Sequence, residues 1–91
     1  MKIFPESVEE RLAAFITDRF FIWKEPDTLL GEKVILLIEG REEAYRDLLM
    51  NLQKETVFSK YELPKKIYYL PHFKTTESGK IQREITAKLV L

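Results

Sequence analysis

The stretch Lys33–Glu39 constrains the fold of this chain most strongly, because it is a near-continuous apolar run within a sequence of 91 residues. Its centre, Val34–Ile38, has five apolar side chains in succession. A strand of this kind is typical of a sheet whose two faces are both covered. Ninety-one residues are enough for one small domain. We therefore expect a single domain in which Lys33–Glu39 is a strand buried on both faces.

Two other segments have the character of strands. Arg19–Lys24 is a short aromatic and β-branched run. The turn residues Pro26-Asp27 and Gly31 separate it from Lys33–Glu39 and favour an antiparallel pairing of the two strands. Gly31 is expected to permit the turn into the second strand. A third strand is predicted at Lys66–Leu70, after an irregular segment that ends in a proline.

Two longer segments have helical periodicity. Glu6–Ile16 has apolar side chains at i, i+4, i+7 and i+8. It begins either at Pro5 or at a Ser-x-x-Glu capping box that starts at Ser7. Glu42–Lys54 has acidic residues in its first turn, which suit the helix dipole. Its apolar stripe consists of Tyr45, Leu48, Leu49 and Leu52.

A terminal helix at Arg83–Leu89, with Ile85 and Leu89 on one side, completes the predicted order α-β-β-α-β-α. This order indicates a small α+β domain with a three-stranded, mostly antiparallel sheet and flanking helices. The composition is 45% apolar and includes six Phe, four Tyr and one Trp. These residues suffice for a compact core.

The formal net charge is zero, which does not favour bulk attraction to nucleic acid or to an anionic membrane. Residues 54–91 nevertheless carry eight basic and four acidic side chains. That excess suits either an anionic ligand or ordinary solvated lysines. The absence of cysteine excludes disulfides and thiolate metal sites within these residues. The sequence has no apolar run of membrane-spanning length and no signal peptide, so we expect a cytoplasmic protein.

The segment Thr76–Arg83, with the sequence Thr-Glu-Ser-Gly-Lys-Ile-Gln-Arg, has the strongest chemical signal. The pair Ser78-Gly79 lets the backbone turn tightly, because glycine has no Cβ. Lys80 then presents a compact positive charge with three donors on a flexible stem. Such a lysine suits a phosphate or a developing oxyanion, although a Ser-Gly-Lys turn by itself is usually a solvated loop.

Two upstream strings add to this signal. Lys60–Ile67 has the sequence Lys-Tyr-Glu-Leu-Pro-Lys-Lys-Ile, and Pro26–Glu32 has the sequence Pro-Asp-Thr-Leu-Leu-Gly-Glu. With Thr76–Arg83, in this order and spacing, they resemble the C-terminal domain of the adenylate-forming superfamily. That superfamily includes acyl- and aryl-CoA ligases, peptide-synthetase adenylation domains and luciferases. The resemblance spans nearly the whole chain, and within the superfamily it is greatest to the o-succinylbenzoate–CoA ligases of menaquinone biosynthesis.

The resemblance implies a role for Lys80 as the lysine that enters the active site when a carboxylate attacks the α-phosphate of ATP. Ser78 would contribute a loop hydroxyl and Gly79 the turn that presents the lysine, whereas Arg83 would be structural. The sequence differs from the family pattern at Phe73-Lys74-Thr75, where Leu-Pro-Lys is usual. The missing proline predicts a less rigid loop.

The resemblance further implies an AMP-forming acid–CoA ligase that uses ATP with Mg²⁺ and then CoA. A large N-terminal domain of the same chain would hold the phosphate loop, the nucleotide pocket and the acyl pocket, none of which has a counterpart here. The opening Lys2–Glu9 resembles the end of the motif after the interdomain hinge, with Ser7 where Glu is usual. The hinge is therefore expected upstream of Met1. We expect the isolated chain to be folded yet inactive and to hold no metal.

Other residues have less specific expectations. Lys65 and Lys66 suit either a CoA phosphate or solvent, His72 is expected to be an ordinary loop residue, and Trp23 to lie in the core or an interface. The remaining candidates are expected to be surface charges or to shape the backbone: Glu9, Glu10, Glu32, Glu42, Glu43, Tyr61 and Pro64. A different class also fits, namely a stand-alone adaptor domain that docks on another protein through its aromatic surface, with Lys80 incidental.

Overall fold

The computed structural model describes residues 4–27, 29 and 31–91. Lys2 and Ile3 of the opening motif, and Thr28 and Leu30 of the predicted turn, lie outside these residues. The elements follow the predicted order α-β-β-α-β-α, with one 3₁₀ helix added. They are α1 (Pro5–Leu12), β1 (Phe20–Asp27), β2 (Gly31–Glu39), η1 (Glu42–Tyr45), α2 (Leu48–Gln53), β3 (Lys66–Leu70) and α3 (Arg83–Lys88).

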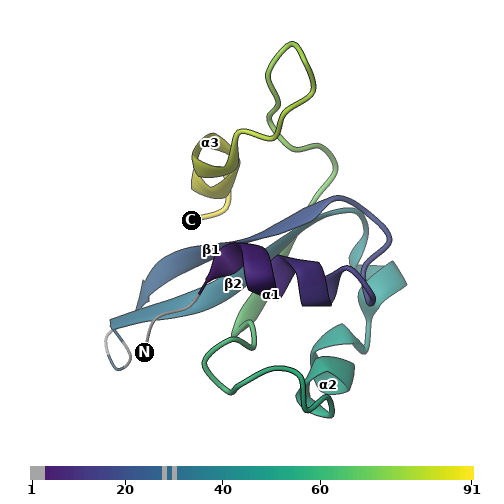
Figure 1. Ribbon diagram of the computed structural model, residues 1–91. Helices are drawn as coiled ribbons and strands as arrows, with labels where there is room; N and C mark the ends of the chain where they lie inside the picture. The colour runs from purple at the N-terminus through teal and green to yellow at the C-terminus, as the bar shows by residue number, and fades with distance from the viewer. Residues whose placement is uncertain (1–3, 28, 30) are drawn as a thin grey trace.

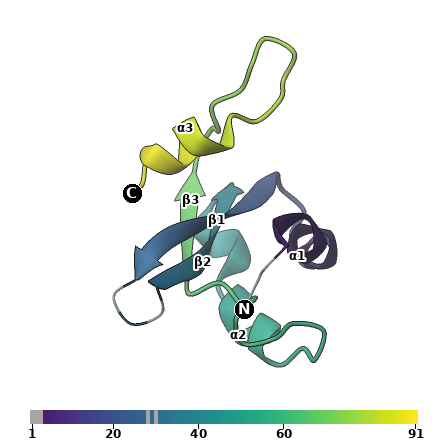
Figure 2. The ribbon, with the colours of Figure 1, turned by 60° about the vertical axis from the view of Figure 1, so that its left-hand side comes forward.

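β2 is the central strand of a three-stranded sheet with the order β1-β2-β3 (Figures 1 and 2). Leu36 of β2 is paired with Ile22 in β1, which is antiparallel, and with Ile67 in β3, which is parallel. A parallel neighbour requires a crossover connection, and η1 with α2 provides it. Gly31 has a φ of +81° at the turn into β2, as predicted. The predicted α+β class is confirmed.

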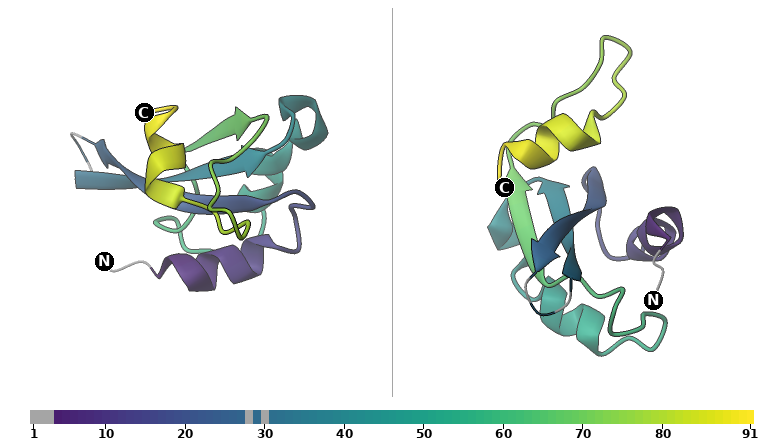
Figure 3. Two further views of the ribbon diagram at one scale, coloured as in Figure 1. Left: turned by 90° about the horizontal axis from the view of Figure 1, so that it is seen from above. Right: turned by 90° about the vertical axis from the view of Figure 1, so that its left-hand side faces the viewer.

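Both faces of β2 are buried, which confirms the interpretation of its apolar run. All five residues of Val34–Ile38 are at most 3% exposed. On one face Leu36 lies in a cluster with residues of α1 and α2, which include Leu12 and Leu52. On the other face Ile35 lies in a cluster with Ala87 of α3. Figure 3 shows α3 on one side of the sheet and α1 with α2 on the other.

The predicted second helix, Glu42–Lys54, is wrong as a single element. The structure has η1, then a break at Arg46-Asp47, then α2. Tyr45, the last residue of η1, has a tertiary contact that local periodicity does not report. Its hydroxyl donates to Asp18 Oδ2 at 2.7 Å and accepts the Asp18 backbone N–H at 3.1 Å, which holds Tyr45 against the loop that follows α1.

The two terminal helices also differ from their predictions. α1 begins at Pro5 and has no side-chain cap, so the Ser7 box does not mark its start; it ends at Leu12 rather than Ile16. α3 buries Thr86 and Ala87, whereas Ile85 and Leu89 are 49% and 53% exposed, and their side faces solvent. A small residue such as Ala87 lets α3 approach the sheet closely. None of the helices in the described ranges is both long and apolar enough to cross a membrane.

Candidate active site

Residues 74–82 form a β-hairpin that projects from the sheet, well beyond the end of β3 (Figure 1). We call this segment the Lys80 hairpin. Its two arms are joined where the Gln82 N–H donates to the Lys74 carbonyl at 2.8 Å and the Thr76 N–H donates to the Lys80 carbonyl at 2.9 Å. An isolated bridge between Thr75 and Ile81 lies between these two bonds. The segment predicted as a loop is therefore a hairpin.

The tip of the hairpin is closed by Thr76. Its carbonyl accepts the Gly79 N–H at 2.9 Å, and its hydroxyl oxygen accepts the Lys80 N–H at 3.1 Å. The same oxygen lies 3.0 Å from the Ser78 hydroxyl. Gly79 has a φ of +89°, a conformation that disfavours any residue with a Cβ. Ser78 and Gly79 thus shape the turn that presents Lys80.

Lys80 itself is exposed. Within the part of the chain that the structure describes, no carboxylate forms an ion pair with its ammonium. Lys80 is thus a solvent-facing lysine that follows a turn. Its backbone is fixed by the hydrogen bonds of the tip, whereas its side chain is available to a ligand from outside the domain.

The incoming arm of the hairpin is attached to the end of β2. The Phe73 N–H donates to Glu39 Oε2 at 2.7 Å, and the Phe73 ring packs edge-on against Phe21 at 5.2 Å. Arg19 binds the same carboxylate through two nitrogens, at 2.8 and 2.7 Å. The hydrogen bond from Arg19 lowers the pKa of Glu39, aided by the Phe73 N–H and the charges of Arg19 and His72. Glu39 is therefore ionised at neutral pH.

The outgoing arm is attached to α1 and β1 through Arg83, the first residue of α3. Its guanidinium lies 3.2 Å from Glu9 Oε1 and 5.8 Å from the centroid of the Phe21 ring. The other oxygen of Glu9 accepts the Ile22 N–H at 2.9 Å. The structural role expected for Arg83 is supported by these contacts. Glu9 is not the surface charge that was predicted, because its side chain is 14% exposed and joins three elements.

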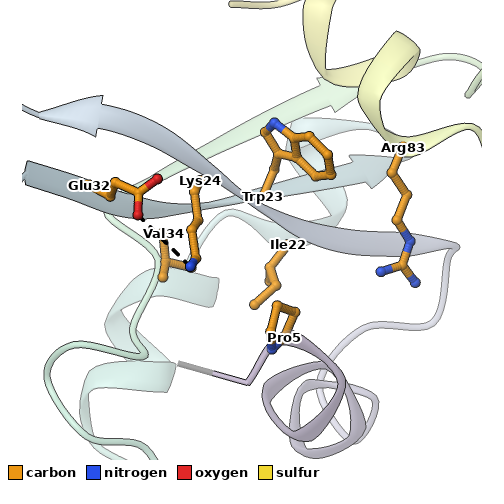
Figure 4. Close-up of a pocket in the computed structure, with 7 residues that line it drawn as sticks. All are labelled: Pro5, Ile22, Trp23, Lys24, Glu32, Val34 and Arg83. Carbon is orange, nitrogen blue, oxygen red and sulfur yellow. Dashed lines mark ion pairs between the residues drawn. The ribbon is translucent and has the colours of Figure 1, made fainter. Parts of the chain in front are cut away.

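A hollow of about 450 Å³ lies beside Arg83, between the start of α1 and the hairpin of β1 and β2 (Figure 4). Trp23 lines it, which places this side chain at the edge of the core. At the far end of the hollow Lys24 and Glu32 form a long ion pair of 3.9 Å. The remaining lining residues are Pro5, Ile22 and Val34.

The other predicted residues are not brought together with Lys80. Lys65 and Lys66 are exposed at the start of β3, whereas the Lys80 hairpin follows its end. Lys66 lies over the Tyr68 ring at 4.7 Å. His72 is an exposed loop residue. Tyr61 is 46% exposed. Of the remaining candidates, Glu10, Glu42 and Glu43 are exposed and Pro64 is buried.

Sequence reasoning missed Thr86. Its side chain is fully buried, and its hydroxyl oxygen accepts the Lys74 N–H at 3.1 Å. The signal was a polar residue next to Ala87, on the side of α3 opposite to the more apolar Ile85 and Leu89. Nothing in the sequence showed that this side faces the base of the hairpin.

Comparison with known proteins finds solved structures that are similar to this chain. No family model matches the chain, and no curated protein matches it. An acyl-CoA synthetase (AMP-forming)/AMP-acid ligase II-like protein from Dyadobacter fermentans is 33% identical, with a TM-score of 0.86 over 100% of this chain. An acyl-CoA synthetase from Brucella canis is 26% identical, with a TM-score of 0.72 over 93% of it. MatB from Rhodopseudomonas palustris is 18% identical, with a TM-score of 0.79 over 98%.

The chain is much shorter than these neighbours. It spans 27% of the Dyadobacter protein, 17% of the Brucella protein and 18% of MatB. The likeness covers nearly all of the present chain in each case, so it concerns the whole domain rather than one hairpin or helix. The fold of this chain is therefore that of a part of the AMP-forming acyl-CoA synthetases.

Proposed function

We propose that these 91 residues are the mobile C-terminal domain of an AMP-forming acid–CoA ligase, and that Lys80 is its adenylation lysine. The full enzyme would activate a carboxylate with ATP to an acyl-adenylate and then form a thioester with CoA. The fold likeness to acyl-CoA synthetases supports this, as does the small share of each neighbour that the chain spans. An ATP-bound MatB structure is also among the neighbours, which supports ATP as a substrate.

The observation that carries the proposal is the presentation of Lys80. An ordered turn holds its backbone by two hydrogen bonds of the tip, while its ammonium has no ion-pair partner among the described residues. A lysine that served the stability of this domain would be paired or packed within it. A lysine held out on an ordered hairpin suits a partner in another domain.

The chemistry proposed for Lys80 is the one that the sequence resemblance implies. In the adenylating pose its ammonium would lie between the substrate carboxylate and the α-phosphate of ATP, both of which the large N-terminal domain would hold together with Mg²⁺. It would keep nucleophile and electrophile together and offset the charge that develops on the phosphate. Rotation of this domain would then withdraw Lys80 and allow CoA to attack the adenylate. Such gating by domain closure is a common way to divide a reaction into steps.

The first acid to assay is o-succinylbenzoate. Its support is the sequence resemblance to that group of ligases, since the acyl pocket belongs to the large domain and not to these residues. A panel of aliphatic and aromatic acids in an ATP–pyrophosphate exchange assay of the full-length enzyme tests this choice. If the enzyme prefers another acid, that acid takes the place of o-succinylbenzoate in the proposal, and the proposed role of Lys80 is unaffected.

The role of Lys80 is tested by measuring the two half-reactions separately in the full-length enzyme. Lys80→Ala is expected to slow acyl-adenylate formation by about 10²–10³ in kcat, because one preorganised charge is lost. Thioester formation from preformed acyl-adenylate is expected to be spared. Lys80→Arg is expected to rescue poorly, since a planar guanidinium does not replace a compact ammonium.

The matched control is Lys88→Ala, which removes an exposed lysine that is paired with Glu84 on α3 and is expected to change neither half-reaction. Equal impairment of both half-reactions by Lys80→Ala would indicate general disruption of the domain. No impairment of either would end the catalytic assignment and leave the adaptor interpretation. The isolated chain is expected to show background ATP–pyrophosphate exchange, and clear exchange from it would contradict the proposal.

A further inference from the structure

The base of the Lys80 hairpin contains a buried hydroxyl. Thr86 has 0% exposure, and among the described residues it is the one polar or charged residue that is buried. Burial of a hydroxyl carries a free-energy cost unless its hydrogen bonds are made. Valine has the same shape and would fill the site without that cost. The hydroxyl of Thr86 therefore needs an explanation beyond packing.

The hydroxyl oxygen connects the two arms of the hairpin. It accepts the Lys74 N–H of the incoming arm at 3.1 Å and donates to the Gln82 carbonyl of the outgoing arm at 2.8 Å. The arms are also joined directly, because the Gln82 N–H donates to the Lys74 carbonyl at 2.8 Å. These hydrogen bonds link Lys74, Gln82 and Thr86 at the point where the hairpin leaves the domain, and the Thr86 N–H also donates to the Gln82 carbonyl at 3.0 Å.

An ordinary helix contact accounts for only part of this arrangement. Threonine hydroxyls in helices often bond the carbonyl four residues earlier, and the bond to Gln82 is of that kind. The bond from Lys74 joins residues twelve positions apart, so helix geometry does not explain it. Lys74 is exposed, but its backbone N–H is directed to the buried Thr86 hydroxyl. The long-range bond links the incoming arm of the hairpin to α3.

We propose that Thr86 is a positioning residue for Lys80, because its hydroxyl locks the two arms of the hairpin at their base. This inference rests on the proposed function of Lys80. Between Thr86 and Lys80 the connection is continuous: the locked pair Lys74–Gln82, the bridge Thr75–Ile81 and the Thr76–Lys80 bond. Loss of the lock lets the arms separate and displaces the lysine. A misplacement of about 1 Å at a reacting group costs roughly 10²-fold in rate.

The test compares Thr86→Val, which keeps the shape and removes the hydroxyl, with Thr86→Ser, which keeps the hydroxyl. In the 91-residue chain, we expect Thr86→Val to speed amide hydrogen exchange at Thr76 and Gln82 by tenfold or more, and Thr86→Ser to restore protection. In the full-length enzyme, Thr86→Val is expected to lower kcat for adenylation by about 10- to 100-fold with little change in KM for ATP. Thioester formation from preformed adenylate is expected to be spared.

Glu62→Gln is the control for lost stability, because it breaks the Arg11–Glu62 pair, which touches neither arm of the hairpin. It is expected to leave the ratio of the two half-reactions unchanged. Unchanged exchange at Thr76 and Gln82 in Thr86→Val would overturn the lock. Faster exchange with normal adenylation, in an enzyme that Lys80→Ala impairs, would overturn the positioning role. If Lys80→Ala itself has no effect, the proposed function fails, and the exchange data alone decide whether Thr86 locks the hairpin.

Discussion

The sheet with its covering helices and the Lys80 hairpin are held together in different ways. In β2, five successive side chains are at most 3% exposed, and apolar burial on both faces stabilises the strand. In the hairpin, every residue from Lys74 to Lys80 is exposed. Backbone hydrogen bonds and two threonine hydroxyls hold it, and only Ile81 near its base packs against the cluster on the α3 side of the sheet. The domain therefore separates the part that provides its stability from the part that presents its charged group.

This difference predicts how each region responds to change. A core side chain removed from the sheet leaves a cavity, whose cost falls on the whole domain. A hydrogen bond removed from the hairpin contributes only about 0.5–1.5 kcal/mol, and its loss opens the hairpin locally. Variants in the sheet should therefore lower the stability of the whole domain, whereas variants in the hairpin should have smaller effects that appear as local opening.

The largest effect is expected from Leu36→Ala. Leu36 has no exposed surface and lies at the centre of β2. Its truncation should lower the free energy of unfolding by about 2–5 kcal/mol, a large part of the total for a small domain. Urea unfolding followed by circular dichroism measures the change. A loss below about 1 kcal/mol would contradict the view that burial of β2 stabilises the domain.

The second effect is an acid sensitivity at Glu62, on the α1 side of the sheet. The hydrogen bonds from Arg11 and from the Ser59 N–H lower the pKa of Glu62 to about 2, from its ordinary value of 4.5. A lowered pKa means that the stabilisation is complete above the unfolded value and is lost as the pH falls from about 4.5 to about 2. We expect a loss of about 1.5–3 kcal/mol over that range.

The comparison of wild type with Glu62→Gln isolates this effect, because other carboxylates titrate in both proteins. Urea midpoints at pH 6 and near pH 2 should differ more in the wild type than in the variant. The same pH dependence in both proteins would show that the Arg11–Glu62 pair contributes nothing to stability.

A smaller and more local effect is expected from Gly79→Ala. A φ of +89° is strained for alanine, while among the described residues, its two chain neighbours aside, no atom lies within 4 Å of the position that its Cβ would take. The cost is therefore conformational, about 1 kcal/mol. Gly31→Ala is the matched control, since Gly31 has a φ of +81° and equally open space, but sits in the β1–β2 turn. Exchange should quicken only around the hairpin for Gly79→Ala. Gly31→Ala should lower the urea midpoint, and a reversed pattern would break the comparison.

The smallest effect on stability is expected from Lys80→Ala. Its side chain is exposed and forms no ion pair with the described residues. The free energy of unfolding should change by no more than about 0.5 kcal/mol, as measured by urea titration. A larger loss would show that Lys80 serves the fold. The contrast between intact stability and slow adenylation is what separates the hairpin from the sheet.

The strands were more predictable from the sequence than the helices. The apolar run at Val34–Ile38 and the bounds of β3 are determined by local composition, and both were confirmed. The predicted Glu42–Lys54 helix was wrong as a single element, and the break follows Tyr45, whose hydroxyl binds Asp18, 27 residues away. Local periodicity does not report such a contact.

The candidate site was predictable in part. The turn at Gly79 and the exposure of Lys80 follow from residue type, and the structure has both. The catalytic role of Lys80 stays a prediction. Glu9 and Thr86 anchor the base of the hairpin through tertiary contacts. Glu9 contacts Arg83, 74 residues away in the sequence, and Thr86 contacts Lys74, 12 residues away. Each of them looked like an ordinary helix residue in the sequence, because its partner lies in another element.

The central position of β2 has a mechanical consequence for the domain. Its alternate side chains belong to the α1–α2 layer and to the α3 layer, so neither layer can slide or melt without disturbing the strand that both share. Glu9 and Arg83 add an ion pair that joins α1 to α3 across the edge of the sheet. Because Glu9 lies in α1 and Arg83 directly follows the Lys80 hairpin, this ion pair connects the first helix to the outgoing arm of the hairpin.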